Sequence, residues 1–242
     1  MAIIGINGKI SSGKDTIGSI IQYLVDKDRY GYQQPDSQED LEAYCINFNP
    51  KYCKWKVKKF AGKLKEIAAL LTGCTIEQLE DQEFKKLDVG PDWGMTYREL
   101  LQKLGTEAMR NGLHTNVWVN ALFADYHPTP NKTIDESFME QFVTGRSEVH
   151  YQLSNWIITD MRFPNELEAV KAKGGITIRV NRPTKDLLGN NVNAQLPLTI
   201  MTQHSSETAL DDAKFDYVID NNGTIEDLIQ KVKVILVKED II

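Results

Sequence analysis

The amino end of the chain constrains the fold more than any other segment, because a glycine-rich turn there joins an apolar run directly to a helix-compatible stretch. The apolar run covers residues 3–6, and the turn over residues 8–16 has the sequence GKISSGKDT. Gly8 and Gly13 permit backbone conformations that a Cβ would exclude, so successive amides can curl around an anion. The unpaired N–H groups of the following helix face the same point. This order predicts a phosphate-binding loop for a nucleotide.

The residues after the second glycine depart from the usual pattern of such loops. Lys14 supplies a mobile positive charge that can follow the β- and γ-phosphates. The lysine is usually followed by Ser or Thr, whose hydroxyl ligates Mg²⁺, but here Asp15 and then Thr16 follow. Either Asp15 faces a metal ion through water, or Thr16 contacts a phosphate while Asp15 orders the turn near the helix dipole. The residues alone leave both alternatives open.

Composition narrows the classes of protein. A length of 242 residues with 41% hydrophobic residues suits one domain, or one domain with a lid. A net charge of −6 argues against a general nucleic-acid coat. Cys45, Cys53 and Cys74 have neither an even count nor ligand-like spacing, which favours simple thiols in a reducing compartment. No apolar run approaches the roughly 20 residues of a membrane span. We expect a cytoplasmic protein without nucleic-acid or membrane partners.

Apolar, β-rich runs alternate with segments of helical period along the chain. Strands that are nearly all apolar and separated by helices predict an α/β fold with a parallel sheet covered on both faces. The predicted strands cover residues 3–6, 55–60, 156–159, 176–180 and 217–219, and the predicted helices cover residues 16–26, 61–71, 97–111, 115–125, 164–173 and 224–237.

Three further stretches lack a clear period. Residues 29–52 and 128–154 are polar and contain proline, so we interpret them as insertions at the surface. Residues 183–203 are polar and rich in asparagine, which is typical either of a lid or of a linker. We therefore predict one domain over residues 1–242, with two insertions and a lid-like segment.

Ligands of such sheets bind at the carboxyl ends of the strands, where Asp160 and Arg162 follow the third apolar run. An acid at this place can hold the Mg²⁺ shell or orient an acceptor, and an arginine can balance charge on a moving phosphoryl group. The alternative is that Asp160 caps the helix that begins near Pro164.

Lys63 and Lys65 follow the second predicted strand and lie in the first turn of a helix. Cations are unfavourable there because the helix dipole is already positive, unless an anion such as an acceptor phosphate lies between them. The alternative is a solvated basic face, with Glu66 and Glu77 neutralising the two lysines.

Single side chains elsewhere allow two interpretations each. Arg98 and Gln102 are four residues apart and share a helix face, so both could reach one ligand, although the period alone predicts a packing helix. Trp118 fits a core position better than a base-stacking platform. Arg182 ends a strand before the lid-like segment and could bring positive charge over phosphates.

Several motifs occur in an order that resembles a known family. They are residues 8–16 with the ending Gly-Lys-Asp-Thr, 60–65 (FAGKLK), 101–106 (LQKLGT), 159–162 (TDMR), 182–183 (RP), 204–207 (HSSE) and 216–223 (DYVIDNNG). The ordered set resembles the deoxynucleoside monophosphate kinases of large tailed phages and their bacterial relatives, within the P-loop nucleotide kinases.

The resemblance implies a three-layer P-loop kinase fold and transfer of the ATP γ-phosphoryl group to a deoxynucleoside 5′-monophosphate, with Mg²⁺. It implies a phage-type enzyme of the host cytoplasm with small nucleotide substrates, and a homodimer is compatible with the sequence. The implied ATP-binding residues are Gly8, Ser11, Ser12, Gly13, Lys14, Asp15 and Thr16. The implied acceptor-binding residues are Lys63, Lys65, Arg98, Gln102, Gly105, Thr106, Trp118, Asp160, Arg162 and Glu166. The implied catalytic residues are Lys14, Asp160, Arg162 and the lid-side Arg182.

Two other functions compete with this one. The animal-type phosphomevalonate kinases have a similar Gly-Lys-Asp loop, Gly-x-Leu-Lys segment and Asp-x-Arg motif. A nucleotide needs a flat slot with polar groups, for which Trp118, Gln102 and Thr106 are available. A P-loop switch, motor or non-catalytic module would also bind a nucleotide. It is disfavoured because no Ser or Thr directly follows Lys14 and no guanine-reading Asn-Lys-x-Asp occurs.

Overall fold

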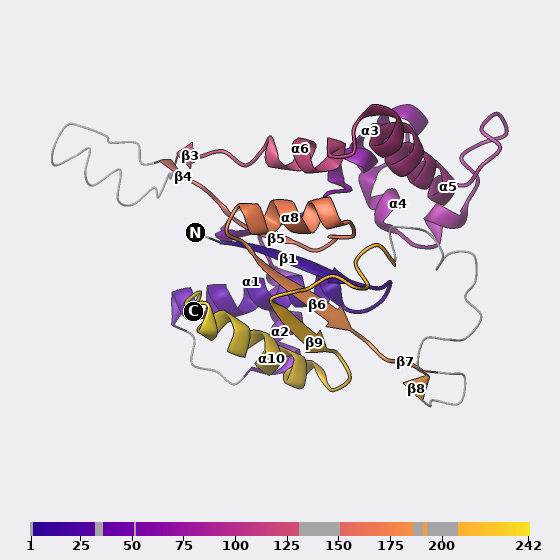
Figure 1. Cartoon of the computed structure of the whole chain (residues 1–242). Helices are drawn as coiled ribbons and strands as arrows, with labels where there is room; N and C mark the ends of the chain where they lie inside the picture. The colour runs from indigo at the N-terminus through magenta and orange to yellow at the C-terminus, as the bar shows by residue number, and fades with distance from the viewer. Residues whose placement is uncertain (1, 32–35, 51, 131–150, 186–190, 193–207) are drawn as a thin grey trace.

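A five-stranded parallel sheet forms the centre of the protein (Figure 1). The computed structural model describes residues 2–31, 36–50, 52–130, 151–185, 191–192 and 208–242. In spatial order the strands are β2 (Trp55–Lys58), β5 (Asn155–Ile158), β1 (Ile3–Gly8), β6 (Ile176–Asn181) and β9 (Tyr217–Asp220). Because β1 lies between β5 and β6, the loop after β1 opens at the middle of the carboxyl edge, where such sheets bind ligands.

Helices cover both faces of the sheet. Successive side chains of a strand point to opposite faces, and the residues of β1 are buried at nearly every position, so both faces must be covered. Ile4 and Ile6 of β1 belong to a core with α1 (Lys14–Tyr30) and α10 (Ile225–Lys238). Ile3 belongs to a second core with α6 (Val117–Phe123) and α8 (Pro164–Ala172). The expected three-layer α/β fold is confirmed.

A group of helices beside these layers, which we name the helical arm, contains α3 (Gly62–Thr72), α4 (Ile76–Glu80), the 3₁₀-helix η1 (Phe84–Lys86), α5 (Tyr97–Gln102) and the π-helix η2 (Lys103–Leu113). The arm has a small core of its own, formed by Ala68, Leu79, Tyr97 and Leu100. The chain enters it directly from the carboxyl end of β2. The arm therefore lies next to the edge of the sheet at which ligands are expected.

The predicted helix over residues 97–111 has a different form in the structure. It is an α-helix to Gln102 and a π-helix to Leu113, and the backbone N–H of His114 accordingly donates to the carbonyl of Met109. The indole N–H of Trp118 donates to the carbonyl of Gly105 at 2.8 Å, which engages that carbonyl outside the helix. Glycine at position 105 also weakens the α-helical preference of the segment.

The segment at 29–52 is more ordered than the sequence suggests. α1 extends to Tyr30, and α2 (Gln38–Asn47) follows, with Ser37 as its N-cap. Leu41 is buried, and Tyr44 packs edge-on against Tyr23. The apolar stripe of α2 is short and lies among acids, so its period is easily missed.

The other two irregular stretches are described in part. β3 (Thr129–Pro130) pairs antiparallel with β4 (Tyr151–Gln152), and β7 (Thr184–Lys185) pairs antiparallel with β8 (Asn191–Val192). The rest of the predicted insertion, the rest of the lid-like segment and the motif at 204–207 lie outside the described residues. The division into one domain with two insertions and a lid stays a prediction. Across the described part of the chain, no helix has the length and apolar character needed to cross a membrane.

Candidate active site

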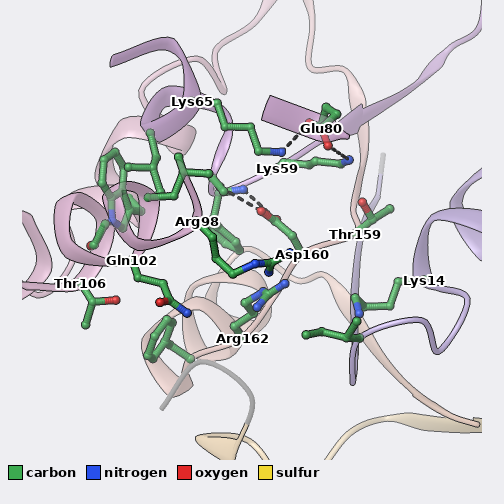
Figure 2. A pocket seen from close by; sticks show the side chains of 18 of the residues that line it. Lys14, Lys59, Lys65, Glu80, Arg98, Gln102, Thr106, Thr159, Asp160 and Arg162 are labelled. Atoms are coloured by element: carbon green, nitrogen blue, oxygen red, sulfur yellow. Dashed lines mark hydrogen bonds and ion pairs between the residues drawn. The ribbon is translucent and has the colours of Figure 1, made fainter. Parts of the chain in front are cut away.

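A cavity of about 330 Å³ lies between the loop after β1 and the helical arm (Figure 2). Its walls come from the phosphate loop, from the loops after β2 and β5, and from the arm. From the loop and from the ends of β2 and β5 they include Ile10, Ser11, Lys14, Asp15, Lys59, Phe60, Ala61, Thr159, Asp160, Arg162, Phe163 and Glu166. From the arm and α6 they include Leu64, Lys65, Glu80, Gln82, Lys85, Arg98, Leu101, Gln102, Gly105, Thr106, Arg110 and Trp118.

The phosphate loop has the backbone that its glycines predict. Gly13 adopts a φ of +98°, in the left-handed region that favours glycine. A Cβ at Gly8 would lie 2.7 Å from the carbonyl oxygen of Val180. Lys14 Nζ donates to the carbonyls of Gly8 and Lys9, each at 2.7 Å. The lysine thus bends over the loop itself.

A buried hydroxyl in this loop fits a phosphate ligand. Within the described residues, Ser12 Oγ is a buried side-chain oxygen without a hydrogen-bond partner. The Ser12 carbonyl accepts from the side-chain amide of Asn221, at the end of β9, at 2.9 Å. The geometry therefore fits a nucleotide phosphate, although Gly8, Ser12, Gly13 and Thr16 are not among the residues that line the cavity itself.

Asp15 links the loop to the end of β5. Its Oδ1 accepts from the Thr159 hydroxyl at 2.8 Å and lies 3.4 Å from Lys59 Nζ. The side chain is 74% exposed, so a hydrated metal ion can approach it. Among the described residues, no cluster of three or more His, Cys, Asp or Glu side chains could hold a metal alone. A single exposed carboxylate beside the phosphate loop fits Mg²⁺, which proteins commonly bind through one or two carboxylates together with phosphates and water.

Asp160 anchors the start of the helical arm. Its two carboxylate oxygens accept from the backbone N–H groups of Phe60 at 2.8 Å and Ala61 at 2.9 Å. Burial raises the pKa of Asp160, while these two N–H groups and the charges of Arg162 and Lys65 oppose that rise. The alternative in which Asp160 caps α8 is wrong. Glu166 performs that role by accepting from the backbone N–H of Phe163 at 3.0 Å.

Four cations converge on the arm side of the cavity: Lys65, Lys85, Arg98 and Arg162. Figure 2 shows Arg98 and Arg162 pointing into the same space near Asp160. Lys65 Nζ lies 2.5 Å from Glu80 Oε1, and Arg98 donates to the Gln82 amide oxygen at 3.1 Å. Burial and the charges of Lys65, Arg98 and Arg162 lower the pKa of Lys85. A lysine whose charge is opposed by its neighbours indicates a site that favours an anion.

Lys63 does not reach the cavity. It lies 3.3 Å from Glu66 and 3.7 Å from Asp125, whereas Lys65 points into the cavity and pairs with Glu80 in place of the expected Glu77. Residues two apart on a helix do not face each other, and of the two lysines Lys65 lines the cavity while Lys63 does not, so an anion between them stays a prediction.

The remaining predicted acceptor residues lie together. Gln102, Gly105 and Thr106 line the cavity beside Arg98, as Figure 2 shows for Gln102 and Thr106. Trp118 is 5% exposed, and its indole N–H is fixed on the Gly105 carbonyl. It therefore forms a wall of the cavity with its ring in the core.

Two lining residues, Arg110 and Glu166, form a buried ion pair; the resemblance implied a site role for Glu166, whereas Arg110 was not selected from the sequence. Arg110 lies 2.6 Å from Glu166, and its guanidinium packs over the ring of Phe163 with the carbon 3.7 Å from the ring centroid. Glu166 also accepts from the backbone N–H of Arg162 at 2.7 Å. Burial raises the pKa of Glu166 to about 7.

Other polar lining residues that sequence reasoning did not select as site residues are Thr159, Lys59, Glu80, Gln82 and Lys85. Lys59 and Thr159 follow β2 and β5, so the rule that selected Asp160 could have found them. Arg182 lies at the end of β6, outside the cavity, and donates to the Ser11 carbonyl at 3.3 Å. It is thus held on the loop side of the site.

Comparisons with known proteins agree with this arrangement. The family model described as deoxynucleotide monophosphate kinase matches residues 74–232. A protein of Acanthamoeba polyphaga mimivirus, provisionally named a deoxynucleotide monophosphate kinase, is 26% identical over 241 residues, covering 96% of this chain and 94% of that protein. The deoxynucleoside-5′-monophosphate kinase of Escherichia phage T5 is 23% identical over 86% of this chain and 84% of its own.

The deoxynucleotide monophosphate kinase of Enterobacteria phage T4 is 28% identical over 136 residues, which cover 56% of this chain and 43% of that enzyme. The family match extends from the helical arm to the last helix and spans well over half of the sequence. The chain therefore belongs to the deoxynucleotide monophosphate kinase family.

Proposed function

We propose that the chain transfers the γ-phosphoryl group of ATP to a deoxynucleoside 5′-monophosphate, which gives ADP and the deoxynucleoside diphosphate. Family membership supports a phosphotransferase acting on deoxynucleotides. The observation that carries the proposal is that a phosphate loop and a cluster of four cations face each other across one cavity. Two anionic substrates can therefore meet there with their phosphates adjacent.

ATP would occupy the loop side. The backbone amides of the loop and the Ser12 hydroxyl would receive its phosphates, and Lys14 would exchange the carbonyls of Gly8 and Lys9 for phosphate oxygens. Asp15, through water, is the residue that would hold Mg²⁺ near the phosphates, and Thr16 would contact a phosphate. When bound, Mg²⁺ supplies positive charge that neutralises phosphate oxygens.

The acceptor phosphate would bind to Lys65, Lys85, Arg98 and Arg162. One of its oxygens is already anionic and forms the new bond to the γ-phosphorus, while the bond from that phosphorus to the β,γ-bridging oxygen breaks and ADP leaves with its electron pair. The step needs orientation and positive charge more than a strong base. Asp160, fixed by two backbone N–H groups, would hold the loop that carries Arg162 and offset part of the positive charge.

The wall beyond the cations favours a nucleotide over phosphomevalonate as acceptor. Gln102 and Thr106 offer amide and hydroxyl groups next to Arg98. Such groups can hydrogen-bond to the edge of a base, whereas phosphomevalonate needs only a small anionic pocket. The family match supports the same choice.

A panel of acceptors tests the proposal. The purified chain is incubated with MgATP and, separately, with each of the four deoxynucleoside monophosphates, their ribose counterparts and phosphomevalonate, and the diphosphate product is quantified. We expect rapid ADP formation only with one or more deoxynucleoside monophosphates. ADP formation at one rate with and without every acceptor would contradict the proposal.

A further inference from the structure

Lys59 lies where the two sides of the cavity meet. It follows β2 directly, and its Nζ lies 3.4 Å from Asp15 Oδ1 and 3.5 Å from Glu80 Oε2. Asp15 belongs to the first turn of α1, on the ATP side, and Glu80 ends α4, on the acceptor side. Figure 2 shows Lys59 and Lys65 on either side of Glu80. The Lys59 ammonium thus stands between the places proposed for the two substrates.

The contacts of this ammonium are long, while its backbone is fixed. Both distances lie at the outer limit of a hydrogen bond, in contrast to the 2.5 Å between Lys65 and Glu80. The Lys59 carbonyl accepts from the Gly62 N–H at 3.0 Å, and the next two N–H groups are bound by Asp160. The root of the side chain is therefore held in place, whereas its tip can change partners at small cost.

Neither carboxylate is stranded when the ammonium moves. Asp15 keeps the hydrogen bond from the Thr159 hydroxyl at 2.8 Å. Glu80 keeps its pair with Lys65. A carboxylate left without any partner would destabilise the site. The Thr159 hydroxyl and Lys65 remain as the partners of Asp15 and Glu80, so this cost does not arise. The Lys59 side chain is 28% exposed and lines the cavity, so a phosphate can reach it.

We propose that Lys59 is a further catalytic residue, whose ammonium leaves Asp15 and Glu80 and contacts the γ-phosphoryl group during transfer. The inference rests on the proposed function. The three equatorial oxygens of the γ-phosphoryl group carry negative charge during transfer. Cations on the ATP side, on the acceptor side and between the two substrates stabilise this charge. Lys14 approaches from the ATP side and Arg162 from the acceptor side. Lys59 supplies the cation between them.

The test compares Lys59→Gln with Lys56→Gln in the full chain. Lys56 lies on β2, bonds to the Pro50 carbonyl and does not line the cavity, so its variant is the matched control. We expect Lys59→Gln to lower kcat about 100-fold, the usual effect of losing one preorganised donor, with the KM of both substrates within about threefold of wild type. Lys56→Gln keeps the wild-type kcat.

Two more variants distinguish a catalytic role of Lys59 from a structural role in linking α1 to the arm through Asp15 and Glu80. Lys59→Met keeps the stem of the side chain and must lose kcat as Lys59→Gln does, with an unchanged melting temperature. Glu80→Gln removes the ion pairs of Glu80 with both Lys59 and Lys65. We expect a changed KM for the monophosphate through Lys65, whereas kcat must fall much less than in Lys59→Gln. With an active wild type, any of three results would overturn the inference by itself. They are an equal loss of kcat in Lys59→Gln and Glu80→Gln, a change only in the KM of Lys59→Gln, and full activity of Lys59→Gln. A wild type without transfer to any acceptor would refute the proposed function as well.

Discussion

The phosphate loop and the helical arm face each other across one cavity but are built in different ways. The loop is formed by nine consecutive residues, 8–16, which run from the end of β1 into the first turn of α1. Its shape depends on the left-handed backbone at Gly13 and on the close approach of Gly8 to β6. The arm side of the cavity gathers cations from α3, η1 and α5 and from the loop after β5, which is distant from the arm in the sequence. A local motif thus specifies the loop side of the cavity, whereas three-dimensional packing specifies the arm side.

The two sides also differ in how their charges are held. Lys14 is bound to two carbonyls of its own loop. The cations of the arm face each other and depend on Glu80, Gln82 and Asp160 for balance. Substitutions on the loop side should therefore affect ATP use, and substitutions on the arm side should affect use of the monophosphate.

The largest effect is expected for Lys14→Ala. Loss of the ammonium removes charge stabilisation that grows as the phosphoryl group moves, so we expect kcat to fall at least about 10³-fold, equivalent to about 4 kcal/mol. Steady-state assays with MgATP and the preferred monophosphate measure this loss. The ammonium donates to two carbonyls of its own loop and lies outside the hydrophobic cores, so the melting temperature should change little.

Turnover within tenfold of wild type would show that the loop is not the site of phosphoryl transfer. A melting temperature lowered by more than about 5 °C would show that Lys14 supports the fold, and the sharp division between the two sides would then fail.

The next largest effect is expected for Arg162→Ala. This guanidinium belongs to the acceptor side, so we expect kcat/KM for the monophosphate to fall about 100-fold while the affinity for ATP changes less than threefold. Calorimetric titration with ATP and steady-state kinetics with varied monophosphate separate the two effects. Lys103→Ala removes an exposed cation of η2 outside the cavity and is the matched control.

An equal loss of ATP affinity and monophosphate use in Arg162→Ala would move this residue to the space between the substrates. The acceptor phosphate would then depend on Lys65, Lys85 and Arg98.

The same contrast explains how far the sequence alone could reach. The five strands of the sheet and the helices that cover it follow from hydrophobic period, because each buries a regular apolar face. The segment between residues 73 and 96 has no such period. Its first short helix, α4, is fixed by the cap Thr75 and by Leu79 in the core of the arm, and that core is known only from the folded chain.

Site residues follow the same division. The candidate site residues in the phosphate loop and at the end of β5 could be selected from short sequence motifs. Glu80, Lys85 and Arg110 carry no local sign of their position, because burial and long-range pairing alone bring them to the cavity. Lys63 shows the converse, since a motif selected it although its side chain pairs with Glu66 outside the cavity in this structure.

The smallest expected effect concerns the ion pair of Arg110 and Glu166, which joins η2 to the loop of Arg162. Burial raises the pKa of Glu166 from an ordinary value of 4.5 to about 7, so between these values the folded state binds the proton more tightly than the unfolded state. Stability therefore falls as pH rises through this window. Between pH 5 and 7 the contribution of Glu166 to the free energy of unfolding should drop by on the order of 2 kcal/mol.

Urea unfolding of wild type, Glu166→Gln and Glu168→Gln at several pH values measures this contribution. Glu168 is exposed on the same helix, so its variant should keep the wild-type slope of stability against pH, whereas Glu166→Gln should have a flatter one. Contributions of other titrating groups are common to all three proteins and cancel in the difference. Identical slopes in wild type and Glu166→Gln would mean that Arg110 keeps Glu166 ionised throughout. The ion pair of Arg110 and Glu166 would then join the arm to the loop after β5 at every pH tested. The link would be as independent of pH as the backbone conformation of the phosphate loop.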